Sequence, residues 1–163
     1  MGGALRVPGN TTPSAEFNIY VDPHAAHMVL HAGWPIRLVS LDTTMQAELR
    51  REQVEMLASS ESPVTDAIRQ MLAYYFDVFG PQNGVSAFHM HDPLCLAAAF
   101  QPDLISWEPS FVDVELHGTL TLGETVAYFG PLITQSPNVL ASVGVDAGRF
   151  IQLFLQRIKE RFA

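Results

Sequence analysis

The chain has 163 residues, of which 48% are hydrophobic and 16% charged, a balance typical of one globular domain with a sizeable core. Nine basic residues against 17 acidic ones give a net charge of −8 without any Lys or Arg cluster, so no nucleic-acid partner is expected. No apolar run approaches 18 residues, and the N-terminus lacks the pattern of a signal peptide. We therefore expect a single domain over residues 1–163, no membrane partner and a cytoplasmic location, in which the one cysteine, Cys95, is a buried apolar residue.

The first third of the chain predicts a loop, a helix and a strand. Residues 1–14 are rich in Gly, Pro, Thr and Ser, and residues 15–21 are expected to be extended or irregular. Asp22-Pro23 predicts the start of a helix that stops at Gly33. We expect its apolar residues to face inward: Ala25, Ala26, Val29 and Leu30. The branched residues of 35–41 predict a strand, and the order helix, turn, strand indicates an α/β fold with a parallel sheet.

The remainder alternates between helical and extended patterns. Residues 46–58 predict a polar amphipathic helix, and Ser62-Pro63 predicts the start of a longer one that ends near Gly80. Asp92-Pro93 predicts a fourth helix, whose run 94–100 is almost free of polar residues and is expected to be buried on nearly all sides. Strands are then expected over 112–116, 125–129 and 138–145, and a last helix from Asp146.

Three polar groups could carry chemistry, and the first is a set of histidines. His24, His27 and His31 share one face of the early helix, where neutral imidazoles could bind zinc. That face is opposite the expected apolar face, and no Cys or further carboxylate is nearby in sequence. We therefore favour an ordinary solvated helix face over a metal site.

The other two groups are Asn10 with Glu16 and Asn18, and His91 with Asp92. Two amides and a carboxylate in a loop-rich segment suit the hydroxyls of a polyol, although Asn10 and Asn18 could equally serve local turns. His91 and Asp92 place an imidazole and a hard oxygen ligand on a rigid helix, although Asp92 could simply cap it. Together the two groups offer what hydrolysis of a sugar–base bond needs: a held sugar, a metal ligand and an acid for the leaving group.

Several motifs, in order along the chain, resemble the inosine–uridine-preferring nucleoside hydrolase family. They are Met1-Gly-Gly-Ala, Gly9-Asn-Thr-Thr-Pro-Ser-Ala-Glu-Phe-Asn-Ile-Tyr-Val-Asp-Pro23, Leu41-Asp-Thr-Thr44, His91-Asp-Pro93, Val114-Glu115 and Leu120-Thr-Leu-Gly-Glu-Thr-Val126. The resemblance implies an α/β, parallel-sheet, Rossmann-like fold. It also implies an N-ribohydrolase that splits purine or pyrimidine ribonucleosides into base and ribose.

The resemblance also implies a role for particular residues. Asn10, Glu16 and Asn18 match positions that hold the ribose hydroxyls. Asp92 matches an aspartate that binds the catalytic calcium and touches the ribose diol. His91 matches the histidine beside the leaving base, which is taken as its acid in purine-accepting members. Among the aromatic residues of 74–79, Phe79 is the best candidate for the base pocket.

The chain departs from the family in one respect. The family opens with an Asp-x-Asp-x-x-x-Asp-Asp motif that supplies most calcium ligands and the base for water, and nothing in this sequence matches it. The chain therefore resembles the C-terminal half only, and Ca²⁺, which takes six to eight oxygens, would need ligands from the missing N-terminal half. We expect a homo-oligomer or association with such a half. The alternative is a catalytically inactive ribose-binding or interaction remnant.

Overall fold

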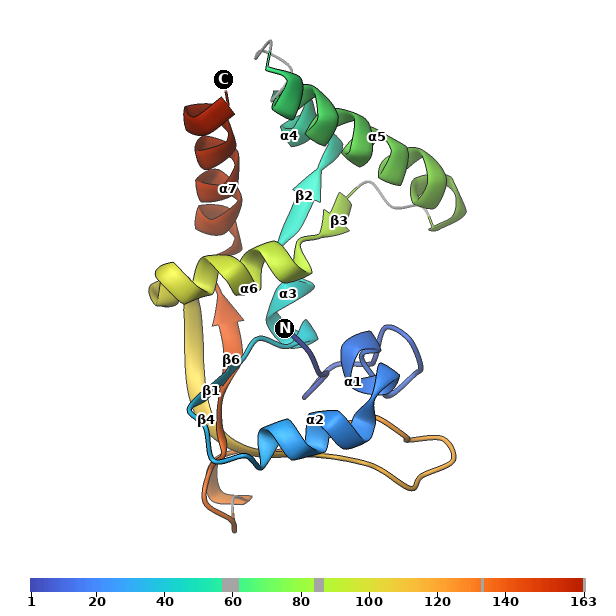
Figure 1. Ribbon diagram of the computed structural model, residues 1–163, viewed down its shortest axis with the longest axis vertical. Helices are drawn as coiled ribbons and strands as arrows, with labels where there is room; N and C mark the ends of the chain where they lie inside the picture. The colour runs from blue at the N-terminus through green and yellow to red at the C-terminus, as the bar shows by residue number, and fades with distance from the viewer. Residues whose placement is uncertain (57–61, 84–86, 133, 163) are drawn as a thin grey trace. The chain divides into compact units, whose positions relative to one another are not determined.

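The computed structural model describes residues 1–56, 62–83, 87–132 and 134–162, apart from the side chains of 79–83 and 132 (Figure 1). The chain divides into two compact units, which we describe one at a time. Unit 1 consists of Met1–Met45 and His91–Val145, and unit 2 consists of Gln46–Met90 and Asp146–Ala163.

Unit 1 is built on a four-stranded mixed sheet. Its elements are helices α1 (Phe17–Val21), α2 (Pro23–Leu30), α3 (Leu41–Thr44) and α6 (His91–Phe100), strands β1 (Ile36–Leu38), β4 (Ile105–Val114), β5 (Thr125–Tyr128) and β6 (Val139–Val145), and 3-10 turns at Pro102–Leu104 and Gly130–Leu132. The strand order is β1-β6-β4-β5, so β6 lies between β1 and β4 (Figure 1). β1 and β6 are parallel, whereas β4 is antiparallel to both β6 and β5, so the sheet is not parallel throughout as the sequence predicted. The α/β prediction is confirmed, with a parallel pair inside a mixed sheet.

One face of this sheet carries the core of unit 1. The buried core residues come from α2 and from β1, β4 and β6: Leu30, Leu38, Val112, Val114, Val139 and Ala141. On β1, β4 and β6, the paired positions Arg37, Pro109 and Leu140 face the opposite side and are exposed. Apolar residues therefore alternate with exposed ones across the sheet, as expected for a layer that is covered on one face.

Unit 2 is a two-stranded antiparallel sheet with three helices. β2 (Glu48–Arg50) pairs with β3 (Ala87–His89), and α4 (Arg51–Glu55), α5 (Pro63–Asn83) and α7 (Ala147–Phe162) complete the unit. The Phe76 ring of α5 is buried and lies 4.9 Å from the Phe88 ring. The predicted starts of α5 and α7 are confirmed within one residue.

Two predicted elements are wrong. Residues 17–21 form helix α1 instead of an extended piece, because Glu16 caps its first turn. Residues 46–58 do not form one helix: Glu48–Arg50 is strand β2, because it pairs with a segment about forty residues later, and only Arg51–Glu55 is helical.

Three predictions of burial also fail. Helix α6 buries Leu94, Ala97 and Ala98, but Leu96 and Phe100 are 69% and 59% exposed, so the helix is covered on one face only. In α2, Leu30 is buried and Val29 is exposed, because His27 and His31 occupy the face that lies against β4. Cys95 of α6 is partly exposed rather than fully buried.

Across the described residues, every helix is too short or too polar to cross a membrane. This finding agrees with the absence of long apolar runs from the sequence.

Asn138, just before β6, joins three segments of unit 1. Its Oδ1 accepts the Val112 N–H at 2.8 Å, and its Nδ2 donates to the carbonyl oxygens of Val112 and Leu30 at 2.8 and 3.2 Å. The amide thus completes the hydrogen bonding of β4 and caps the end of α2.

We predict that Asn138→Asp lowers the free energy of unfolding by about 1–3 kcal/mol, because a carboxylate cannot donate to two carbonyls. Urea unfolding followed by circular dichroism measures the loss. Gln152→Ala on the exposed side of α7 is the matched control, and an equal loss in both variants would contradict the role of Asn138.

Candidate functional site

The carboxylate of Glu16 organises the first turn of α1. It caps the helix, accepting the N–H groups of Asn18 at 2.9 Å and Ile19 at 3.2 Å, and it also accepts the Gly3 N–H at 3.1 Å. Glu16 is only 2% exposed. Three hydrogen bonds to backbone donors compensate the cost of burying the charge and fix both carboxylate oxygens in place.

Asn10 and Asn18 lie beside the same turn. Asn10 accepts the Phe17 N–H at 2.9 Å, and Asn18 donates to the Met1 carbonyl at 3.3 Å; both side chains are exposed. The loop before Asn10 requires glycine at position 9, because a Cβ at Gly9 would lie 2.2 Å from the Ala15 carbonyl oxygen. The structure therefore brings the three predicted ribose-binding residues together around the start of α1.

His91 opens helix α6 and is held by Thr44 of α3. Its Nδ1 lies 2.7 Å from the Thr44 Oγ1, and Thr44 itself is fully buried. Asp92 follows in the same first turn of α6 and is exposed. The hydroxyl sets the orientation of the imidazole, which a group that transfers a proton requires.

Helix α3 connects the two groups of predicted residues. Its Asp42 accepts the N–H groups of Leu5 and Arg6 at 2.9 and 2.8 Å, which fastens the N-terminal segment that Glu16 also holds, and its Thr44 holds His91. Because α3 follows β1 directly, this connection lies just past the carboxyl end of a parallel strand, where α/β sites are usually found.

Sequence reasoning missed Asp42 and Thr44 as contributors to the site. Both stand in Leu41-Asp-Thr-Thr44, directly after the predicted strand, where polar residues are typical of a site. The motif formed part of the family resemblance without any role being assigned to these two residues. Their partners are 36 and 47 residues away in sequence, at Arg6 and His91, so no local pattern could reveal them.

The side chain of Phe79 lies outside the described part of the structure, so its predicted place in the base pocket stays a prediction. Its neighbours on α5 differ in burial: Phe76 is buried, whereas Tyr74 and Tyr75 are exposed. Phe76 is therefore a core residue, and the two tyrosines are not.

The described residues do not form a calcium cage. Asp92 brings one carboxylate, whereas Ca²⁺ takes six to eight oxygens. Among the residues with described positions, the one group of three or more His, Cys, Asp or Glu whose ligand atoms meet is His27, His31 and Asp113, and Asp92 does not belong to it.

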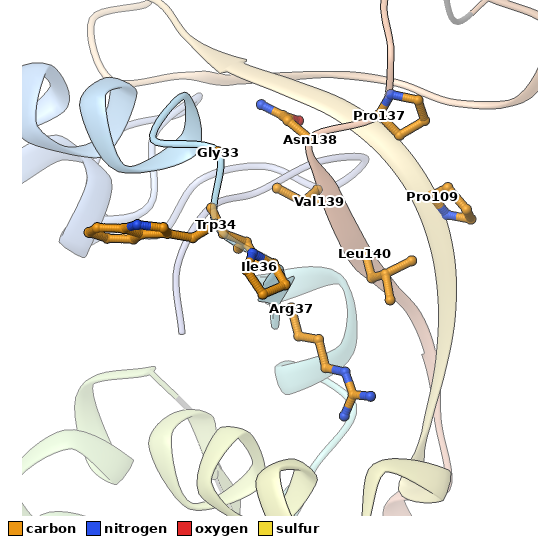
Figure 2. A pocket seen from close by; sticks show the side chains of 10 residues that line it. Gly33, Trp34, Ile36, Arg37, Pro109, Pro137, Asn138, Val139 and Leu140 are labelled. Atoms are coloured by element: carbon orange, nitrogen blue, oxygen red, sulfur yellow. The ribbon is translucent and has the colours of Figure 1, made fainter.

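An open pocket of about 780 Å³ lies elsewhere in unit 1, at the amino ends of β1 and β6. Figure 2 shows the side chains that line it, with Trp34 on one side and Leu140 and Pro109 on the other. None of the predicted site residues lines this pocket. The pocket is therefore separate from the predicted site residues around α1 and α3.

Residues 1–152 match the sequence model of the family described as inosine-uridine preferring nucleoside hydrolase. The chain belongs to the inosine–uridine-preferring nucleoside hydrolase family. The family resemblance inferred from the motifs is thereby confirmed.

Relatives and solved structures of this nucleoside hydrolase family show the extent of the match. The pyrimidine-specific ribonucleoside hydrolase RihA of Escherichia fergusonii is 35% identical over 160 residues, which are 98% of this chain and 51% of RihA. The purine-preferring ribonucleoside hydrolase from Gardnerella vaginalis superimposes with a TM-score of 0.89 at 29% identity, over 98% of this chain and 51% of that one. The plant nucleoside hydrolase PpNRh1 gives a TM-score of 0.86 at 28% identity, over 96% and 51%. The chain thus spans about half the length of these nucleoside hydrolases.

We predict that Thr44→Val removes the hydrogen bond between Thr44 and His91 while keeping the volume of the buried side chain. The imidazole ¹⁵N resonances of His91 should shift, and the free energy of unfolding should fall by about 1 kcal/mol, because one hydrogen bond is lost. Thr44→Ser, which keeps the hydroxyl, should preserve both values. A His91 spectrum that is the same in Thr44→Val and in the unaltered chain would contradict the contact.

Proposed function

We propose that residues 1–163 form the C-terminal portion of a nucleoside N-ribohydrolase and carry its ribose-binding and leaving-group residues. In this reaction, water replaces the base at C1′ of the ribose, and the bond between C1′ and the base nitrogen breaks. Its transition state resembles an oxocarbenium ion. The observation that carries the proposal is that, in a chain of this family, Asn10, Glu16 and Asn18 gather around one helical turn.

Asn10, Glu16 and Asn18 are proposed to bind the ribose hydroxyls. The two asparagine side chains are exposed, so each can turn a polar atom towards a sugar beside the start of α1. The carboxylate of Glu16 accepts three N–H groups, and a carboxylate offers about four acceptor positions, which leaves room for one hydroxyl. The same hydrogen bonds keep the carboxylate from moving when the sugar arrives.

His91 is proposed to give a proton to the departing base. An unprotonated base nitrogen is a poor leaving group, because it departs as an anion. An imidazole held beside it can donate a proton and so lower the barrier to bond breaking. Thr44 supplies the required orientation through its 2.7 Å contact with Nδ1. Phe79 is proposed to line the base pocket. The relatives named above differ in their stated base preference, so we assign none to this chain.

Asp92 is proposed to bind the ribose diol and to be one ligand of the calcium ion on which the family typically depends. The other ligands and the carboxylate that activates water would come from outside residues 1–163. For that reason the isolated chain is proposed to be a binding half rather than a complete enzyme. The alternative, favoured by the single carboxylate at this position, is a remnant that binds ribose or a partner and takes no part in hydrolysis.

We predict that the isolated chain releases ribose from inosine or uridine, with Ca²⁺ present, far more slowly than the typical enzymatic rate of about 1 per second or more. A fusion that places the part of Escherichia fergusonii RihA lying outside the matched region ahead of Met1 should restore hydrolysis. In that fusion, His91→Ala should lower the rate about 10²–10⁴-fold, and Gln152→Ala should leave it unchanged.

A reducing-sugar assay distinguishes the outcomes. Hydrolysis at ordinary rates by the isolated chain would contradict the half-enzyme proposal. Should the fusion not fold, an NMR titration of the isolated chain with ribose provides a second test. Shifts concentrated at the amides of Gly3 and residues 17–19 would support the ribose site, and shifts spread evenly over the chain would refute it. Ribose binding together with a folded but inactive fusion would favour the remnant.

We also predict that the isolated chain self-associates or binds a separate N-terminal half. β1 is at the edge of its sheet among the described strands, and Trp34 beside it is 65% exposed. An uncovered parallel edge next to apolar side chains favours pairing with another chain. Analytical ultracentrifugation at tens of micromolar measures this, and a single monomeric species under those conditions would contradict the prediction.

A further inference from the structure

The imidazoles of His27 in α2 and of His31, the residue that caps the end of α2, both contact one carboxylate oxygen of Asp113 in β4. His27 and His31 are four residues apart and therefore neighbours on one face of the helix. The His27 Nδ1 lies 2.6 Å from the Asp113 Oδ1, and the His31 Nε2 lies 3.2 Å from the same oxygen. The imidazole ring centroids are 4.4 Å apart.

The three ligand atoms lie close enough together to be candidates for one metal site. All lie within 4.8 Å of one another. In a tetrahedral zinc site, nitrogen and oxygen ligands lie about 2.0–2.2 Å from the ion, so neighbouring ligands are about 3.3–3.6 Å apart. An ion among these atoms would replace the 2.6 Å contact between the His27 Nδ1 and the Asp113 Oδ1 and would hold the two atoms further apart. All three side chains are about one-third exposed, so an ion and its remaining water ligands have access from solvent.

Asp113 and His31 are held in place by their surroundings. The Val114 N–H donates to the Asp113 Oδ1 at 2.8 Å, and the Phe111 ring meets the His31 ring edge-on at 5.8 Å. Partial burial tends to raise the pKa of Asp113, but hydrogen bonds from His27, Val114 and His31 outweigh it and hold the pKa below its usual range. The carboxylate is therefore ionised at neutral pH, as a metal ligand has to be.

The site differs in chemistry and in residues from the proposed nucleoside site. Two imidazoles and one carboxylate suit Zn²⁺ and similar transition-metal ions, whereas Ca²⁺ prefers oxygen ligands alone. None of Asn10, Glu16, Asn18, His91 and Asp92 takes part in it. His24, on the same helix, is exposed and does not belong to the group, so a substitution of His24 can serve as the control.

We propose that His27, His31 and Asp113 bind one Zn²⁺-class ion, with water in the fourth position, and that this ion fastens α2 to β4. The two elements already share part of the core through Leu30 and Val112. The ion would add a cross-link between segments that are 86 residues apart in sequence. Because it stabilises the folded state only, it acts as a structural clamp.

Competition with a chromogenic chelator, on the metal-free 163-residue chain at neutral pH, tests the proposal. We expect one Zn²⁺ per chain, a higher midpoint of thermal unfolding with Zn²⁺, and no change in the midpoint with Ca²⁺. His31→Ala should weaken Zn²⁺ binding about 100-fold or more, since loss of even an outer partner of a ligand costs 10–100-fold. His24→Ala should bind like the unaltered chain.

A histidine NMR experiment on the unaltered chain covers the case in which His31→Ala does not fold. Zn²⁺ should then shift the ring resonances of His27 and His31 and leave those of His24 in place. Three results would overturn the proposal: no binding at micromolar Zn²⁺, equal weakening in His24→Ala and His31→Ala, or ring shifts that include His24 to the same extent.

Discussion

Five successive backbone N–H groups at the start of the chain, from Gly2 to Arg6, all find acceptors on other segments of unit 1. The acceptors are the Val39 carbonyl, the Glu16 carboxylate, the Thr125 hydroxyl and, twice, the Asp42 carboxylate. The segment has no regular secondary structure, so hydrogen bonds to other segments, rather than a helix or a sheet ladder, determine its path. They connect residues 2–6 to the end of β1, the cap of α1, the start of β5 and helix α3. The candidate site lies around this N-terminal segment.

The elements that could be predicted from the sequence are those with local causes. Proline at the start of α2 and α5, and Asp146 before α7, are start signals that need no tertiary partner, and the predicted helices begin within one residue of them. α1 and β2 could not be predicted in the same way. The first depends on glutamate, which is not a usual cap, and the second is a strand because Glu48 lies opposite His89 in the sheet.

The same distinction applies to the candidate site. The motifs located Asn10, Glu16, Asn18, His91 and Asp92, since a family resemblance depends on residue types in order along the chain. The resemblance did not reveal which other side chains position these five residues. Thr44 beside His91, Asp42 beside the N-terminal segment and Asp113 beside His27 are partners only after folding, and no spacing in the sequence encodes such pairs. From the sequence alone, the histidine face of α2 is therefore expected to be a solvated surface. In the folded chain, Asp113 of β4 lies against His27 and His31.

The two aspartates that could bind cations, Asp92 and Asp113, have different environments. Asp92 is in the first turn of α6, where the helix dipole favours a negative charge and, for the same reason, weakens attraction for a cation. It belongs to no group of three potential ligands among the described residues. A calcium ion at Asp92 would therefore need further oxygen ligands. At Asp113, by contrast, two imidazoles on one helical face already converge on the carboxylate, so the described chain supplies three ligands itself. Among the described residues, three potential metal ligands thus meet at Asp113 and not at Asp92.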